Sequence, residues 1–198
     1  MKKVIYILNI ALLGVLLTSC FSNSSGDSLK DLVSPEVKFN DVTIEGLYSM
    51  KIPDFMTVTD QLQEDASLQY NNPFKEKYIT VLDETREDIM TFMSDYGVYD
   101  ESKSELENYV DTRLSYFNES GSTIIKQTKL ESKTINGRKA YSIVIDASVP
   151  AIGESATYFF TYIQGKDHFY MISAWTLLDR KAGYADEVDV MMKSFKEL

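Results

Sequence analysis

The sequence predicts an α+β fold in which an antiparallel β-sheet has helices on both faces, an α/β/α sandwich. The stretch Ala156–Thr176 carries aromatic and β-branched residues on both sides of a turn at Gln164–Asp167, which predicts a β-hairpin. Both faces of this hairpin are apolar, since Tyr158 and Phe160 alternate with Phe159. The other segments follow the order strands, helices, strands, helix. A sheet that is apolar on both faces needs a layer of helices on each.

Residues 1–19 have the layout of a bacterial lipoprotein signal peptide. Lys2 and Lys3 form a positive region, an apolar run ends at Leu17, and the sequence LTSC closes the segment at Cys20. The apolar run is too short for a comfortable membrane span. LTSC resembles the lipobox, whose cysteine receives a diacylglycerol. We therefore expect Cys20 to be lipidated and to anchor the protein to a membrane; an ordinary signal peptide with a chance cysteine is the alternative.

Composition narrows the classes of partner and fold. Loss of residues 1–19 removes two lysines, which leaves 18 basic and 30 acidic residues and a net charge of −12. Such an acidic chain is a poor candidate for nucleic-acid binding. Cys20 is the only cysteine, so the mature chain has no disulfide and the fold depends on its core. Residues 20–41 are rich in Ser, Asn and Gly at their start and are expected to be a flexible tether, followed by a single domain at 42–198.

The first part of this domain is expected to supply strands. Alternating apolar residues predict one strand over Val42–Ile52, which Pro53 ends because it cannot donate a ladder hydrogen bond. Two shorter strands are expected near Ala66–Tyr70 and Lys77–Leu82, with a turn signal at Asn71–Pro73 between them.

Three helices are expected. The first covers Glu84 to about Asp95, with Ile89, Met90 and Met93 inward. The second follows a capping box at Ser102–Glu105, and its apolar residues recur at helical spacing up to Gly121. The third covers about Lys181–Lys196 at the end of the chain.

A second hairpin is expected just before the central one. Segments 122–133 and 138–149 flank Asn136–Gly137, which is the strongest short turn signal. Lys126, Lys129 and Lys133 lie on its first strand, and charged residues there are typical of a sheet edge that discourages strand addition.

Three segments resemble those of PsbP-like domains. GLYSMKIPDFM (46–56) looks like their opening strand and proline-containing turn, while SAWTLLDR (173–180) and MMKSFKEL (191–198) are similar to their C-terminal end. The resemblance implies an antiparallel sheet between helices and a place near bacterial envelope lipoproteins of the DcrB-like kind. Members are mostly binding or accessory proteins whose tasks differ, so no specific function transfers. Histidines that match the metal-binding residues of plant members are missing from this sequence, so the resemblance brings no metal or cofactor.

The candidate partner-binding residues are Tyr96 and Tyr99, in the loop Asp95–Asp100 between the first two helices. Loop tyrosines are typical of interfaces because they bury a large area at low entropic cost. The alternative is that both rings fold back as caps on the core.

Other residues indicate no catalytic or metal site. The only histidine, His168, comes just after the central turn, and no GxSxG motif supplies a nucleophile. Paired methionines at 90 and 93 and at 191 and 192 lie on apolar helix stripes, where methionine is ordinary packing. Acids near Asp95 and Asp100 do not have the spacing of a calcium loop. We expect no cofactor and no metal.

Together these features favour a non-catalytic envelope lipoprotein that binds a protein partner. A carrier of a small apolar ligand is the alternative, and a hydrolase that uses carboxylates alone stays open. Phe21 follows Cys20, in place of the aspartate that retains many enterobacterial lipoproteins in the inner membrane. In a host with two membranes, the expected location is the outer membrane, facing the periplasm.

Overall fold

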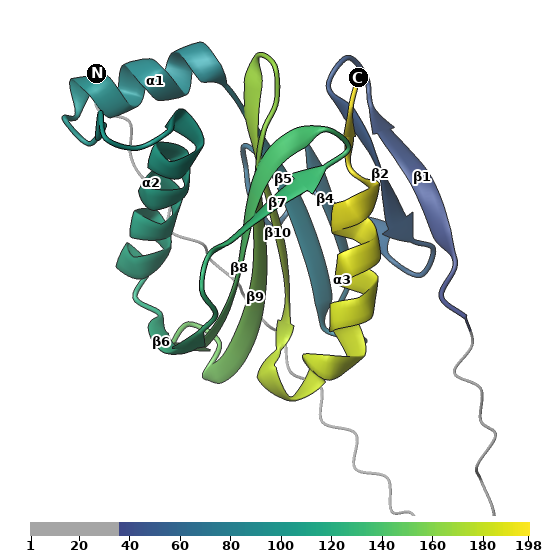
Figure 1. Ribbon diagram of the computed structural model, residues 1–198. Coiled ribbons are helices and arrows are strands. Elements are labelled where there is room, and N and C mark those ends of the chain that lie inside the picture. Colours follow the sequence, from purple (N-terminus) through teal and green to yellow (C-terminus); the bar gives the residue numbers. More distant parts are fainter. Residues whose placement is uncertain (1–35) are drawn as a thin grey trace, which may run out of the picture.

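The computed structural model describes residues 36–198, so the expected signal peptide, Cys20 and most of the expected tether lie outside the described residues. Within them the chain forms eleven strands, three α-helices and one short 3-10 helix (Figure 1). The strands are β1 (Phe39–Ile44), β2 (Tyr48–Pro53), β3 (Thr57–Val58), β4 (Leu68–Asn72), β5 (Lys77–Thr85), β6 (Thr123–Gln127), β7 (Glu131–Ile135), β8 (Arg138–Val149), β9 (Glu154–Gln164), β10 (His168–Leu177) and β11 (Lys196–Glu197). The helices are α1 (Arg86–Asp95), α2 (Glu105–Glu119) and α3 (Ala182–Ser194), with the 3-10 helix at Leu178–Arg180.

The central sheet is antiparallel and has the order β3-β4-β5-β10-β9-β8-β6, with β7 paired to the other end of β8. Strand β10 pairs with β5 on one side and with β9 on the other, and β9 pairs in turn with β8. The prediction that the hairpin at 156–176 is the centre of the sheet is therefore confirmed. The Asn136–Gly137 hairpin is also confirmed, since Ile135 pairs with Arg138 and both turn residues have positive φ, 46° and 82°, as a type I′ turn requires.

The prediction of one strand over Val42–Ile52 is wrong. The segment is a hairpin of β1 and β2, which joins β11 in a separate three-stranded sheet. Gly46 makes the bend at φ 75°, a conformation that glycine adopts without strain. Apolar alternation continues on the same face through this turn, because Ile44 pairs directly with Tyr48, so the sequence pattern contains no sign of the break.

Two hydrophobic clusters hold the fold together. One joins α3 and the small sheet to residues of the central sheet such as Phe159 and Ile163. The other joins α1 and α2 to residues such as Phe160 and Tyr162. Neighbours along a strand point to opposite faces, so Phe159 and Phe160 separate these clusters. In Figure 1 the helix pair α1–α2 lies to the left of strands β8–β10 and α3 lies to their right.

Local hydrogen bonds move several boundaries from their expected places. The strand expected over 122–133 divides into β6 and β7 at Thr128. The Thr128 amide still donates to the Val144 carbonyl at 3.0 Å, but the Val144 amide donates to the Thr128 hydroxyl, also at 3.0 Å, and not to its carbonyl. Helix α2 is capped by Ser104 with Glu107, two residues later than the expected capping box. Helix α1 begins after Thr85, whose hydroxyl accepts a hydrogen bond from the Asp88 amide at 3.1 Å.

Candidate interaction surface

The helix pair is anchored by aromatic stacking on the central sheet. Tyr109 of α2 is fully buried. Its ring stacks on Phe169 with centroids 4.7 Å apart and meets Tyr162 edge-on at 6.1 Å. Ile89 and Met93 of α1 are buried in the same cluster. These side chains fix the inner faces of both helices and leave their outer faces free to carry other residues.

A partly buried ion pair fastens α2 to β5. The Arg113 guanidinium pairs with the Glu84 carboxylate, which also accepts a hydrogen bond from the Tyr109 hydroxyl at 2.8 Å. Burial lowers the pKa of Arg113 and raises that of Tyr109, so removal from water opposes the ionised form of each side chain. The same guanidinium lies over the ring of Tyr116, 5.6 Å from its centroid, a cation–π contact that holds this partly exposed ring.

The loop between the helices is held by a buried amide. The Asn108 side chain accepts a hydrogen bond from the Asp100 amide at 2.7 Å and donates one to the Asp100 carbonyl at 2.9 Å. At the other end of the loop, the Tyr96 amide donates to the Phe92 carbonyl and the Val98 amide donates to the Met93 carbonyl. The loop therefore has a defined course on the end of the helix pair.

An apolar patch lies on the outside of this unit. We define the apolar patch as Phe92, Tyr96, Val98 and Tyr116. Three of its side chains are exposed, at 72% for Tyr96, 51% for Val98 and 42% for Tyr116. The Phe92 ring connects the two tyrosines, with centroid distances of 4.5 Å to Tyr96 and 6.5 Å to Tyr116.

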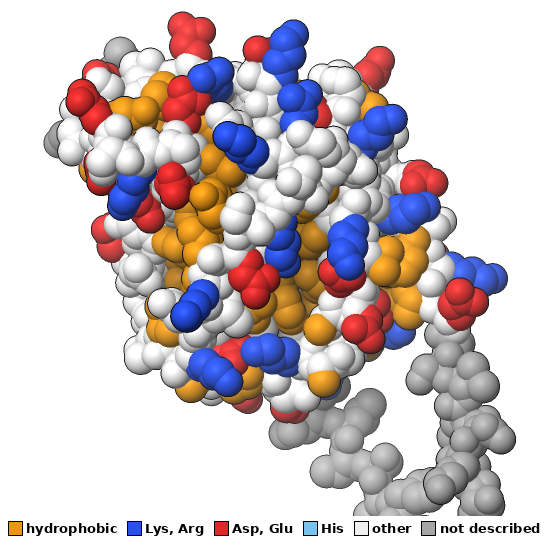
Figure 2. All heavy atoms as spheres, viewed as in Figure 1, with side chains coloured by type: hydrophobic (Ala, Val, Ile, Leu, Met, Phe, Trp, Pro, Cys, Tyr) orange, Lys and Arg blue, Asp and Glu red, His pale blue; other side chains and the backbone are white. Residues whose placement is uncertain are grey.

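Acidic residues outnumber basic ones in the segment that carries the patch. Nine acidic and three basic residues lie between Arg86 and Glu119. Each of the three bases, Arg86, Lys103 and Arg113, is engaged in an ion pair with a carboxylate. Acidic side chains therefore dominate the charge of this segment, and Figure 2 shows acidic side chains beside apolar ones over the end of the molecule that carries α1.

The structure separates the two tyrosines that the sequence singled out. Tyr96 is exposed and belongs to the apolar patch, whereas Tyr99 is half-buried and packs against the cluster beneath α1 and α2. The sequence analysis did not identify Phe92, Val98 or Tyr116. The helical pattern gave no signal for Tyr116, because it lies two turns after the buried Tyr109 and therefore at the edge of the same apolar stripe.

The methionines and the histidine that the sequence analysis considered as metal or catalytic residues lie in or beside the packed core. Met93, Met191 and Met192 are buried in the two clusters and Met90 packs against one of them. His168 is half-buried at the start of β10. Over residues 36–198, we find no three His, Cys, Asp or Glu side chains gathered as metal ligands. Over the same residues no helix has the length and apolar character needed to span a membrane.

Comparison with solved structures gives distant likenesses. Cyanobacterial PsbP (CyanoP) of Synechocystis sp. PCC 6803 matches with a TM-score of 0.51 at 10% identity, over 82% of this chain and 94% of that one. LpqN of Mycobacterium tuberculosis, involved in cell envelope biogenesis, gives 0.48 at 12% identity over 82% and 91%. The Ran-binding protein Mog1p of Saccharomyces cerevisiae gives 0.47 at 14% identity over 81% and 95%. No protein-family model and no curated protein matches the chain.

The likeness to CyanoP shows a PsbP-like fold, a mostly antiparallel sheet with three helices. This part of the sequence-based resemblance is confirmed. At 10% identity the likeness concerns the fold alone, since one fold serves many tasks.

Proposed function

We propose that this protein is a membrane-anchored accessory protein of the bacterial cell envelope that binds a protein partner through the apolar patch. The observation that carries the proposal is the exposure of Tyr96 and Tyr116, whose rings both contact that of Phe92, on a helix pair whose inner side is well anchored. Folding does not require large aromatic side chains in water, and clustered ones are typical of interaction sites. The proposal assigns no catalytic residue, cofactor or metal.

The chemistry of the patch indicates the kind of partner. Tyrosine rings supply contact area with a polar tip and lose little entropy when they are covered. Asn108 fixes the loop, so part of the ordering cost is met before binding. The acidic excess of residues 86–119 favours a partner with basic residues around its contact surface, and association should slow as salt screens the charges.

The anchoring and the layers of the fold belong to the same proposal. Residues 1–19 direct export, Cys20 carries the lipid, residues 20–41 form the tether and residues 42–198 form one α/β/α sandwich that resembles DcrB-like lipoproteins. In a host with two membranes, the domain faces the periplasm from the outer membrane. Cell fractionation tests the anchor: the chain should leave the membrane pellet in a Cys20→Ser variant, and its retention there would contradict lipidation.

Site-specific photo-cross-linking in the native envelope tests the patch. The photoreactive residue p-benzoylphenylalanine replaces Tyr96 in one variant and Tyr116 in another. Phe74 supplies the matched control, since it is an aromatic residue with 96% exposure on the turn between β4 and β5. From positions 96 and 116 we expect cross-linked product of a single molecular mass, corresponding to one partner, in an amount that added salt reduces. From position 74 we expect no cross-linked product. Equal adducts from all three positions, or none from 96 and 116, would reject the proposal.

A further inference from the structure

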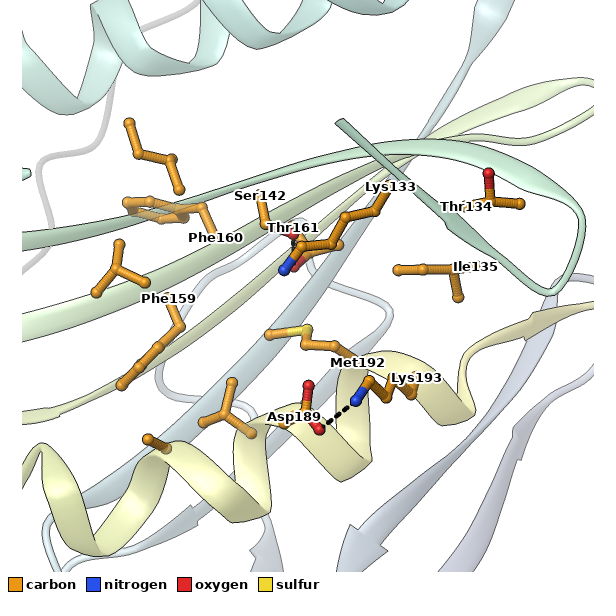
Figure 3. A pocket seen from close by; sticks show the side chains of 14 residues that line it. Lys133, Thr134, Ile135, Ser142, Phe159, Phe160, Thr161, Asp189, Met192 and Lys193 are labelled. Atoms are coloured by element: carbon orange, nitrogen blue, oxygen red, sulfur yellow. Dashed lines mark hydrogen bonds and ion pairs between the residues drawn. The ribbon is translucent and has the colours of Figure 1, made fainter. Parts of the chain in front are cut away.

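A groove opens beside α3 because this helix packs toward the small sheet. Phe195, at the end of α3, stacks on Tyr48 of β2 at 5.1 Å, and the Ser194 hydroxyl accepts a hydrogen bond from the Lys51 amide of β2 at 2.8 Å. Both contacts tie the C-terminal end of α3 to β2. Between α3 and strands β7, β8 and β9 a groove of about 440 Å³ remains (Figure 3), within the range of about 300–1,000 Å³ that is typical of small-molecule sites.

Most of the groove is apolar. The apolar side chains that line it on the α3 face of the sheet are Ile135, Val144, Phe159, Ala185, Val188 and Met192. Figure 2 shows apolar side chains gathered in this middle region of the molecule, framed by charged ones. A surface of this kind favours an apolar chain, because its burial removes hydrocarbon from water on both sides.

One part of the groove is polar and contains a cation. Ser142 and Thr161 face each other on adjacent strands, with hydroxyl oxygens 3.2 Å apart. In Figure 3 the Lys133 side chain points into the groove, toward these two residues in this view. Within residues 36–198, the one carboxylate paired with its ammonium is that of Glu131, at 3.5 Å and on a 64% exposed side chain, a geometry that contributes little.

The second lysine of the groove is already engaged. Lys193 pairs with Asp189 one helical turn away on α3, at 2.7 Å. Of these two lysines, Lys133 is therefore the one whose ammonium can leave its weak ion pair with Glu131 and bind a ligand. A charge-assisted hydrogen bond from Lys133, with the hydroxyls of Ser142 and Thr161 beside it, suits an oxyanion.

We propose that the groove binds a single-chain amphiphile with an anionic head group, the acyl chain lying along α3 and the head meeting Lys133. A fatty-acid carboxylate and a lysophospholipid phosphate share this chemistry. This site is separate from the apolar patch and does not depend on the partner-binding proposal.

The test uses the full chain in lipid nanodiscs with photoactivatable twelve-carbon probes. One probe carries a carboxylate, a second carries a lysophospholipid head, and a third carries a neutral alcohol. We expect labelling of groove residues by the anionic probes. The stronger of the two anionic probes identifies the source, and exclusive labelling by the neutral alcohol would overturn the assignment of the head group.

Two variants and one control locate the site. Ala185→Phe fills the groove and should reduce labelling by every probe roughly tenfold, with unchanged circular dichroism as the folding check. Lys133→Gln should reduce labelling by the anionic probes by about tenfold and spare the alcohol, as expected for a lost charge-assisted hydrogen bond. Lys129→Gln, between β6 and β7 and outside the groove lining, should change nothing. Labelling that is insensitive to Lys133→Gln, or equally sensitive to Lys129→Gln, would overturn the proposal.

Discussion

The two hydrophobic clusters of this protein are closed in different ways. The α3 cluster is sealed by segments from both ends of the domain, since Tyr48 of β2 contacts both Tyr170 and Phe195. The helix-pair cluster is sealed by one local segment, residues 86–119, whose anchors are Tyr109 and Arg113. The aromatic rings that seal the α3 cluster are buried, whereas the helix pair also carries exposed aromatic rings, those of Tyr96 and Tyr116.

Both regions contain a partly buried ion pair, but they differ in the charged residues that they expose to solvent. Under α3, Lys77 and Glu187 form a pair at 2.7 Å with side chains only 10% and 12% exposed, and the Tyr184 ring lies beside the ammonium. The helix pair carries an excess of acids that face solvent. The helix pair therefore adds to its buried inner side an exterior that the fold itself does not need. The following changes test this contrast.

The largest effect should come from the anchor between the helix pair and the sheet. Phe169 is fully buried and stacks on Tyr109, so Phe169→Ala should lower the free energy of unfolding by about 3–5 kcal/mol through lost burial and a cavity. Urea unfolding followed by tryptophan fluorescence measures it. Phe74→Ala, at a 96% exposed ring, should stay within about 0.5 kcal/mol. Equal losses would contradict the assignment of inner and outer surfaces.

A smaller effect should follow when the buried ion pair is broken. Glu84→Gln leaves Arg113, whose side chain is 16% exposed, without its charged partner. We expect a loss of about 2–3 kcal/mol, the range for hydrogen bonds to charged groups. Arg86→Gln removes the more exposed pair with Glu105 and should cost less than about 1 kcal/mol. A loss below that value for Glu84→Gln would show that α2 does not depend on this pair.

A smaller, pH-dependent effect is expected where Lys181, at the start of α3, meets Asp146 of β8. Burial alone would raise the pKa of Asp146, but hydrogen bonds from Lys181, at 2.9 Å, and from the Thr157 hydroxyl, at 2.7 Å, hold it below its ordinary value. A carboxyl group whose pKa is lower in the folded state than in the unfolded state stabilises the fold at pH values above its unfolded pKa of about 3.9. This contribution disappears as the pH falls through the folded-state pKa.

The Asp146→Asn variant isolates that contribution. Its deficit relative to the unchanged chain should be present at pH 7 and should shrink as the pH falls below about 4. Urea unfolding at pH 7 and again below pH ~4 measures this difference in the free energy of unfolding. Asp41→Asn, which removes the exposed ion pair with Lys51, is the control. A deficit that is constant with pH would contradict the role of the ionised carboxylate.

The sequence predicted the parts of the fold that depend on local pattern. Two apolar faces on either side of residues 164–167 predicted the central hairpin. The Asn136–Gly137 pair predicted its turn because asparagine and glycine readily adopt the positive φ angles that a type I′ turn requires. The small sheet was missed because alternation passes unbroken through Gly46. The split between β6 and β7 was missed because it depends on Thr128 meeting Val144, 16 residues away.

The candidate site was predicted only in part, for a similar reason. A loop with two tyrosines was recognisable, but Tyr96 and Tyr99 separate by burial only once Asn108 sets the course of the loop. Phe92 and Tyr116 join the patch through ring contacts between α1 and α2, which no pattern along one helix contains. The lipidation of Cys20 stays a prediction, because the described residues begin after it.

The central claim is that the apolar patch serves a partner and not the fold. Its most direct test is the free energy of unfolding of Tyr96→Ala, measured in urea beside Tyr99→Ala. We predict a loss below about 1 kcal/mol for Tyr96→Ala, the range of surface positions. For the half-buried Tyr99 we predict about 2 kcal/mol, between surface and core values. A loss of about 3 kcal/mol or more for Tyr96→Ala would show that its ring supports the core and would contradict the account.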